Sequence, residues 1–292
     1  MREFSRRSVL LASGLALAGC SSSSPSSRPS ALPTSLDTPT PTPSPTHPPS
    51  PTPVFPALTS ADIDATAAGF ANRQPTAWGL DIAGIIQRTD DAGIALTLDA
   101  CGGPGGSAFD QSLIDFLRER QIPATLFLNS RWIEANLSLA QELASDDLFE
   151  LGNHGTRHCP LCVTGRDAYC IPGTATAAEA TREVADNHLY MAQELGVEPR
   201  LFRSGTAHYD DVGIDICRAL GEVPIGFSIN GDGGATFSPA QVESAVSTAH
   251  AGSIIIAHMN QPEGNTAEGM KPGLSRLLDA GFAFTHLPTL PL

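Results

Sequence analysis

The sequence predicts an α/β protein, most simply a distorted (β/α) barrel with about seven parallel strands. Short apolar runs alternate with amphipathic helical segments from residue 93 to residue 287, which is typical of repeated βα units. The apolar runs are continuous rather than interrupted at every second residue, so the strands are expected to be buried on both faces of the sheet. An open, doubly wound sheet is the competing architecture. Both architectures place their chemistry at the carboxyl ends of the strands.

The first half of the pattern supplies three strands and three helices. A strand is predicted where an apolar run ends at Asp99 and a glycine-rich turn, and a helix where Leu113, Phe116 and Leu117 recur at helical spacing. Gly196 marks the end of a long helix. The same criteria give strands at residues 94–98, 124–128 and 149–153, and helices at residues 109–120, 131–144 and 176–195.

The second half repeats the alternation with shorter units. Its predicted strands cover residues 200–203, 223–229, 253–257 and 282–287, and its predicted helices cover residues 212–220, 239–249 and 270–280. Residues 57–89 form a short lead-in before the first strand. The folded domain is therefore expected over residues 57–292.

The N-terminal residues predict export and a lipid anchor rather than part of the fold. Ser5-Arg6-Arg7-Ser8 precedes a short apolar stretch, and Leu17-Ala18-Gly19-Cys20 resembles a bacterial lipobox. The apolar stretch is too short to span a bilayer and has the flanks of a secretory signal. We expect residues 1–19 to be a twin-arginine signal peptide, and Cys20 to be lipidated and to anchor an extracytoplasmic protein to the cell membrane.

Residues 20–56 predict a disordered tether. Ser, Thr and Pro dominate this segment, which holds half of the protein's 24 prolines. Such a composition buries little apolar surface and favours polyproline II. The segment is expected to hold the folded domain away from the membrane.

Charge and composition exclude several classes of protein. The chain has 17 Lys and Arg against 31 Asp and Glu, a formal net charge of −14, whereas nucleic-acid binding depends on basic side chains. We therefore expect no nucleic-acid partner. A hydrophobic content of 41% is too high for a wholly disordered chain. A monomer is expected.

Polar side chains follow the predicted strands at the points where the strands end. Two of them, His154 and His158, stand at positions i and i+4, so they can present two imidazole nitrogens to one cation. The other residues at strand ends are Asp99, Arg203, Asp232 and His258. Because the carboxyl ends of parallel strands meet at one edge, these side chains are expected to converge.

Several short motifs together resemble those of a known family. They are Thr97-Leu98-Asp99, His154 with His158, Phe202-Arg203, Gly231-Asp232 and Ile256-Ala257-His258. Their order and spacing are similar to those of the NodB-homology polysaccharide deacetylases, carbohydrate esterase family four, over roughly residues 93–287. The resemblance implies a metal-dependent hydrolase that removes N-acetyl groups from a cell-wall or extracellular polysaccharide, such as peptidoglycan or a chitin-like glycan. It also implies one divalent metal ion, for which zinc is expected and cobalt, nickel and iron are alternatives.

The resemblance assigns a role to each residue of the predicted site. His154 and His158 are metal ligands, Asp99 is the general base that takes a proton from water, and His258 is the general acid that protonates the leaving nitrogen. Arg203 orients Asp99. Asp232 supports either His258 or Arg203.

The first motif departs from the family. Two adjacent aspartates usually stand there, the second as a metal ligand, but this chain has Asp99-Ala100-Cys101. Three replacements for the missing ligand are open: Asp99 itself, a water molecule, or another side chain. We expect Asp99 to lie near the metal and to share both roles.

The cysteines are interpreted through the expected export. An oxidising location favours disulfides, so one bridge is predicted among Cys159, Cys162 and Cys170. Cys217 is predicted to be a small buried apolar residue. The odd count leaves at least one thiol free.

Three functions remain open from the sequence. The first is a deacetylase acting on an N-acetylated glycan, the second an O-acetyl esterase of the same fold, and the third a glycan-binding lipoprotein impaired by the change at Ala100. Trp132, Tyr169 and Tyr209 are candidates for stacking on sugar rings, although core packing is the expected role of Trp132.

Overall fold

A computed structural model describes residues 57–287 of the chain. The predicted signal peptide, residues 1–19, and the predicted linker, residues 20–56, lie outside the described residues. Among residues 57–287, no helix is long and apolar enough to cross a bilayer.

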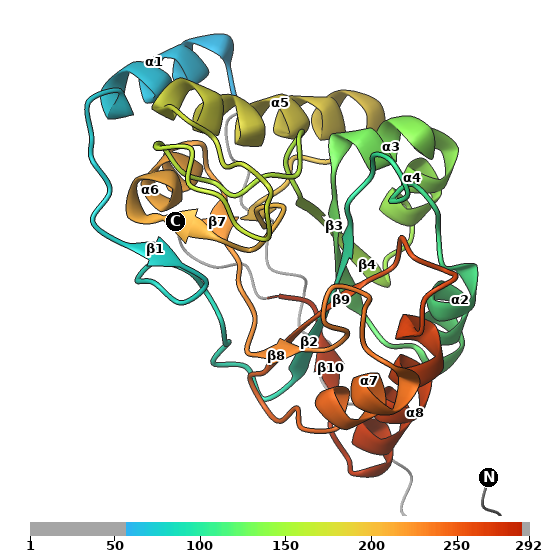
Figure 1. The fold of residues 1–292 in the computed structure, drawn as a ribbon. Helices are drawn as coiled ribbons and strands as arrows, with labels where there is room; N and C mark the ends of the chain where they lie inside the picture. The colour runs from blue at the N-terminus through green and yellow to red at the C-terminus, as the bar shows by residue number, and fades with distance from the viewer. Residues whose placement is uncertain (1–56, 288–292) are drawn as a thin grey trace, which may run out of the picture. The chain divides into compact units, whose positions relative to one another are not determined.

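The described residues form helices and short strands in alternation (Figure 1). The strands are β1 (Trp78–Gly79), β2 (Ile94–Ala100), β3 (Ala124–Leu128), β4 (Phe149–Asn153), β5 (Leu201–Phe202), β6 (Tyr209–Asp210), β7 (Val223–Pro224), β8 (Ile229–Asn230), β9 (Ile254–His258) and β10 (Phe284–Thr285). The helices are α1 (Ser60–Phe70), α2 (Gln111–Arg120), α3 (Ser130–Ala135), α4 (Leu137–Ala144), α5 (Ala177–Leu195), α6 (Asp211–Ala219), α7 (Pro239–Val246) and α8 (Thr266–Asp279).

The main sheet confirms the predicted fold class. Its strand order is β7-β5-β4-β3-β2-β9-β8, with β10 paired to the start of β2, and every neighbouring pair in it is parallel. The two outermost strands, β7 and β8, do not pair with each other. Isolated bridges from Ile86 to Ile225 and from Arg88 to Ser253 carry the lead-in segment across this gap. The sheet is therefore an incomplete barrel of seven parallel strands, with β10 as an eighth strand beside the start of β2.

Strand β2 is fully buried along its length and separates two environments. Leu96, Leu98 and Ala100 belong to the large apolar cluster shared with the surrounding helices. Thr97 and Asp99 alternate with them, so they point into the barrel because successive side chains of a strand face opposite ways. The side chain of Ala100 therefore faces the helices and points away from the interior of the barrel.

Three predicted elements differ from the structure. The predicted strand 223–229 is two strands, β7 and β8, because the chain crosses from one outer edge of the sheet to the other. The predicted helix 131–144 is interrupted at Asn136, whose side-chain amide donates to the carbonyls of Ser107 and Trp132. The last predicted helix, 270–280, begins earlier, at Thr266.

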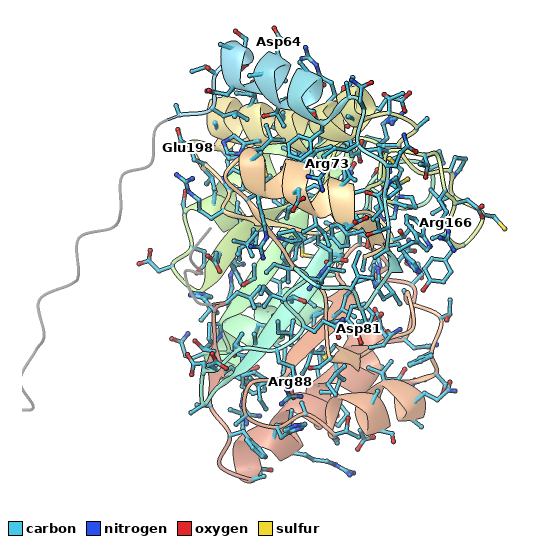
Figure 2. The ribbon with its side chains drawn as sticks, turned by 90° about the vertical axis from the view of Figure 1, so that its left-hand side faces the viewer. Asp64, Arg73, Asp81, Arg88, Arg166 and Glu198 are labelled. Atoms are coloured by element: carbon cyan, nitrogen blue, oxygen red, sulfur yellow. The ribbon has the colours of Figure 1, made fainter. Side chains whose placement is uncertain are left out.

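The lead-in contains a helix that the sequence did not predict. Thr59 and Asp62 form a capping box at the start of α1, and Ile63 is buried in a second apolar cluster with residues of α5 and α6. Figures 1 and 2 show α1 lying over these two helices. An ion pair of 2.6 Å joins Arg73 just beyond α1 to Asp215 of α6.

The disulfide prediction is wrong for the described residues, because Cys101, Cys159, Cys162, Cys170 and Cys217 are all free. The Cys162 thiol donates to the Thr174 carbonyl at 3.0 Å, and Cys170 lies on an exposed turn. Burial raises the pKa of Cys159 to about 12, so this thiol stays protonated. Cys217 is buried, as predicted.

Candidate active site

Adjacent strands bring the predicted site residues to one end of the sheet. Asp99 at the end of β2 is the register partner of His258 at the end of β9. Asn153 at the end of β4 pairs with Phe202 of β5, which places His154 beside Arg203. A cavity of about 710 Å³ opens at this end, and Asp99, His158 and His258 are among its lining residues.

Arg203 and Asp99 form a buried ion pair. An Arg203 Nη1 proton is donated to Asp99 Oδ1 at 2.7 Å, and Nη1 also lies 2.8 Å from the Thr97 hydroxyl. The guanidinium lies over the Phe127 ring, 4.2 Å from its centroid. Burial raises the pKa of Asp99, but the charges of Arg203 and His154 outweigh burial and hold the pKa below its usual value. Asp99 is therefore a carboxylate at neutral pH, with Oδ2 directed away from Arg203.

The backbone fixes the orientation of His154. Its Nδ1 lies 2.8 Å from the Arg203 carbonyl, which can only accept, so Nδ1 carries the proton and donates. Nε2 is then the nitrogen free to bind a cation. This nitrogen lies 3.7 Å from Asp99 Oδ2 and 3.9 Å from Cys101 Sγ.

His158 lies on a strained turn. Its φ angle is +61°, which is unusual for a residue other than glycine, and its ring stands edge-on to that of His154 with centroids 4.9 Å apart. A side chain at Gly205 would collide with the His158 backbone, since a Cβ there would lie 2.2 Å from the His158 carbonyl carbon. The close approach of this glycine therefore contributes to the position of the turn.

Glu183 of α5 holds the same turn from below. Its buried carboxylate accepts from the Thr156 hydroxyl at 2.7 Å, from the Arg157 amide at 3.0 Å and from the His158 amide at 3.1 Å. These bonds satisfy the backbone donors of a turn that no regular secondary structure supports. Glu183 was not among the predicted site residues, because nothing in the pattern of a long amphipathic helix distinguishes one glutamate from the others.

His258 and Asp232 form a second pair across the cavity. His258 Nδ1 lies 3.0 Å from Asp232 Oδ1, and the His258 amide donates to Oδ2 at 2.8 Å. The Thr266 hydroxyl also donates to this carboxylate. Burial lowers the pKa of His258, but the Asp232 charge more than compensates and raises the pKa well above its usual value. Of the two partners that the sequence left open for Asp232, the structure places His258 against it.

A third donor joins the two histidines. Cys101 Sγ and one nitrogen each of His154 and His158 all lie within 4.8 Å of one another, and this is the only such set of three among the described residues. Thiolate and imidazole are the ligands that zinc prefers. These donors therefore fit the divalent ion that the resemblance implies.

Cys101 was not among the predicted site residues. Its position two residues after Asp99 was the signal that could have identified it, because residues i and i+2 at the end of a strand face the same way. Burial raises the pKa of the Cys101 thiol, but hydrogen bonds to His154 and His158 lower it well below its usual value overall.

The three aromatic candidates for sugar stacking differ in burial. Trp132 is fully buried, as expected, and so is Tyr209, whose hydroxyl lies 2.9 Å from the Ser204 amide. Tyr209 is therefore unavailable for sugar stacking. Tyr169 is 72% exposed and lines the cavity.

The sequence of this domain matches that of a known protein family. Residues 86–224 match the family model for polysaccharide deacetylases. Over these residues the chain matches a polysaccharide deacetylase domain, and its fold is of the NodB-homology type. The matched residues of the deacetylase domain include Asp99, His154, His158 and Arg203, whereas Asp232 and His258 follow them in the chain.

Solved structures share the fold of this deacetylase domain. A pseudoenzyme of carbohydrate esterase family four from Bacillus anthracis aligns with a TM-score of 0.58 and 19% identity, covering 71% of this chain and 69% of its own. A family 4 carbohydrate esterase from Streptomyces lividans, solved with acetate, aligns with a TM-score of 0.56 and 23% identity, covering 68% and 95% of the two chains. At these identities the likeness shows the fold, and the fold class includes active and inactive proteins.

Among curated proteins, the uncharacterized protein YlxY of Bacillus subtilis is 23% identical over 179 residues, or 61% of this chain. This chain spans about half the length of this relative, since 51% of it is covered. The activity of the whole protein therefore has to be argued from the site.

Proposed function

We propose that the protein is a metal-dependent deacetylase that removes N-acetyl groups from a cell-wall or extracellular glycan. The observation that supports this most is the placement of a carboxylate and an imidazolium on neighbouring strands, with a set of metal donors beside them. Asp99 and His258 are register partners, and His154, His158 and Cys101 lie at the same strand ends. Amide hydrolysis requires a base, an acid and a group that stabilises developing negative charge.

The protein's own residues divide the proton transfers between them. Asp99 accepts the proton of the attacking water, and Arg203 keeps Asp99 ionised and fixed in orientation. His258 enters the reaction protonated, because Asp232 stabilises its positive charge, and it donates this proton to the departing nitrogen. A divalent ion held by His154 and His158 would polarise the acetyl carbonyl and activate water.

The cavity has the character expected for a neutral sugar. Asp99 is its only carboxylate, no lysine or arginine lines it, and glycines make up much of its wall. Tyr169 provides an exposed aromatic face, and aromatic rings suit the apolar faces of sugars. An uncharged N-acetylated glycan fits these features better than a charged substrate.

Acetate release from N-acetylglucosamine oligomers tests the proposal. His154→Ala should abolish metal-dependent release, and Asp99→Asn should reduce kcat by about 10²–10⁴-fold, the usual contribution of a general base. His250→Ala is the matched control, since His250 is exposed and lies outside the cavity lining. Full activity in both site variants would show that the site is wrongly assigned.

Two related functions are compatible with the same site. Ala100 replaces the carboxylate that the family usually has, so a glycan-binding protein without catalysis is the first alternative. An O-acetyl esterase is the second, because the same groups suit ester hydrolysis. Glycan binding without acetate release would favour the first, and release from O-acetylated but not N-acetylated sugar the second.

We also propose that Cys20 carries lipid and anchors the domain outside the membrane through residues 20–56. The lipobox-like sequence before Cys20 supports this. Mass spectrometry of the mature protein should find an acylated N-terminal Cys20. Cys20→Ala should move the protein out of the membrane fraction, whereas an unmodified Cys20 would contradict the anchor.

A further inference from the structure

We propose that Cys101 binds the catalytic metal ion as a thiolate, in the place of the carboxylate that Ala100 has lost. The inference rests on the proposed function, because it concerns the same metal. The metal would then have two imidazole ligands and one sulfur ligand. Such a site differs from one with two imidazoles and a carboxylate in the metals that it prefers and in its sensitivity to oxidation.

The side chains of Ala100 and Cys101 point in opposite directions. Ala100 is fully buried in the apolar cluster on the helix side of β2. Cys101 is partly exposed and lines the cavity. A carboxylate at position 100 would therefore point away from the histidines, whereas the side chain at position 101 points at them. In this chain, position 101 is the one that can supply a ligand from the first motif.

Asp99 is less suited than Cys101 to be the third ligand. Asp99 is committed to Arg203 through Oδ1 at 2.7 Å, and it is not part of the set of three donors that converge. If Cys101 supplies the third ligand, Asp99 remains free to act as the base. The conflict between ligand and base at Asp99, which the sequence left open, is then removed.

The backbone around Cys101 is fixed by its neighbours. Arg131 Nη2 donates to the Cys101 carbonyl at 3.1 Å. The glycines that follow adopt positive φ angles, +66° at Gly102 and +77° at Gly103. A Cβ at Gly102 would lie 2.5 Å from the Trp132 amide, so the chain packs closely on the start of α3. A ligand on such a fixed turn loses little entropy on binding metal.

Metal binding by this thiol is a balanced exchange. One proton leaves Cys101 for solvent as one sulfur–metal bond forms, and no oxidant or reductant takes part. A site of two imidazoles and one thiolate prefers zinc or cobalt(II) over magnesium or calcium, which favour oxygen ligands.

Cobalt(II) titration of the metal-free protein tests the assignment directly. The complex should show the near-ultraviolet absorption of sulfur-to-cobalt charge transfer. That absorption should be absent in Cys101→Asp and Cys101→Ser, and retained in Cys159→Ser, the matched control for a buried thiol beside the histidines. Cys101→Asp should still bind the ion through oxygen, whereas Ala100→Asp should add no ligand and should lower the melting temperature.

Thiol alkylation of the wild-type protein gives a second readout that needs no variant. Zinc should protect Cys101 from iodoacetamide at least about 10-fold, as measured by peptide mass spectrometry. The exposed Cys170 should react equally with and without zinc and serves as the internal control.

The outcomes separate this inference from the proposed function. Cobalt bound without charge-transfer absorption, or zinc bound without protection of Cys101, overturns the thiolate ligand and leaves the deacetylase intact. A charge-transfer band without acetate release supports the ligand and contradicts the deacetylase. Failure to bind any divalent ion overturns both.

Discussion

Asp232 determines the charge of His258 and with it the pH range of the proposed reaction. The acid must be protonated, so activity is lost as pH rises through the His258 pKa, which Asp232 raises well above its usual value. Asp232→Asn should therefore move the alkaline limb of kcat/KM to lower pH. Asp99 and Cys101 also face His258, so the shift should be incomplete. A pH profile of acetate release measures it.

The conservative Thr266→Val provides the control for that profile. It removes one hydrogen bond to Asp232 but leaves the carboxylate charge in place. Its alkaline limb should stay close to that of the wild type. An unchanged limb in Asp232→Asn would show that His258 is not the group whose proton is required.

Tyr169 is the residue through which the cavity is expected to hold a sugar ring. Because 72% of it is exposed, Tyr169→Ala should leave the melting temperature unchanged. A ring contact of about 0.5–1.5 kcal/mol corresponds to a rise in KM of about 2- to 10-fold. Leu189→Ala, at an exposed position on α5 outside the cavity, is the control. An unchanged KM for oligomers in Tyr169→Ala would exclude stacking.

Helix α5 shapes the metal site although it supplies none of its ligands. Glu183→Ala would leave the partly buried Thr156 hydroxyl and the amides of Arg157 and His158 without their acceptor. The cost is about 1–3 kcal/mol for a donor that water cannot reach, and less for one that it can. We expect a lower melting temperature and metal affinity weakened about 10- to 100-fold, as for other residues that orient ligands. Competition with a chelator measures the affinity.

Arg157→Ala is the matched control for Glu183, because the Arg157 side chain is 57% exposed while its ion pair reaches the same carboxylate. Its amide still donates to Glu183 after the change. Metal affinity should stay within about 3-fold of the wild type, since exposed ion pairs contribute little. Equal losses in the two variants would mean that charge, not the hydrogen bonds of the turn, positions His158.

Short elements show where prediction from the sequence reached its limit. The long buried strands and α5 were predicted closely, because their apolar periodicity reflects burial that is local in the chain. The division of residues 223–229 into β7 and β8 depends on partners far away, β5 and β9. The sequence of residues 223–229 alone therefore does not predict the division into two strands.

The candidate site divides in the same way. Asp99, His154 and His258 were identified from their places at the ends of long strands, because the carboxyl ends of parallel strands meet at one edge of the sheet. Cys101 and Glu183 were missed, since their importance comes from which way a turn faces and which helix lies beneath it. The disulfide prediction failed for a related reason: closeness in sequence does not decide where a thiol points. The Cys162 thiol donates to the Thr174 carbonyl, and Cys170 is exposed.

At the scale of the whole domain, the residues before the family match complete the fold. The match begins at residue 86, yet Ile63 and Ile85 before it are buried against α5 and α6. Asp211 of α6 accepts from the Thr76 and Ala77 amides, so the lead-in also satisfies polar groups. Residues 57–85 are therefore part of the structure rather than an appendage.

Two shortened chains test this directly. A chain starting at residue 86 exposes the apolar faces of α5 and α6. Each isoleucine lost from the interior removes about 1.5–3 kcal/mol of stabilisation, so the midpoint of urea unfolding should fall markedly below that of a chain starting at residue 57. The longer chain keeps every described contact, so it should retain acetate release and metal affinity. Because α5 carries Glu183, loosening of its outer face should also weaken metal binding in the shorter chain. Equal unfolding midpoints for the two chains would show that α1 is dispensable and that the barrel supports its own site.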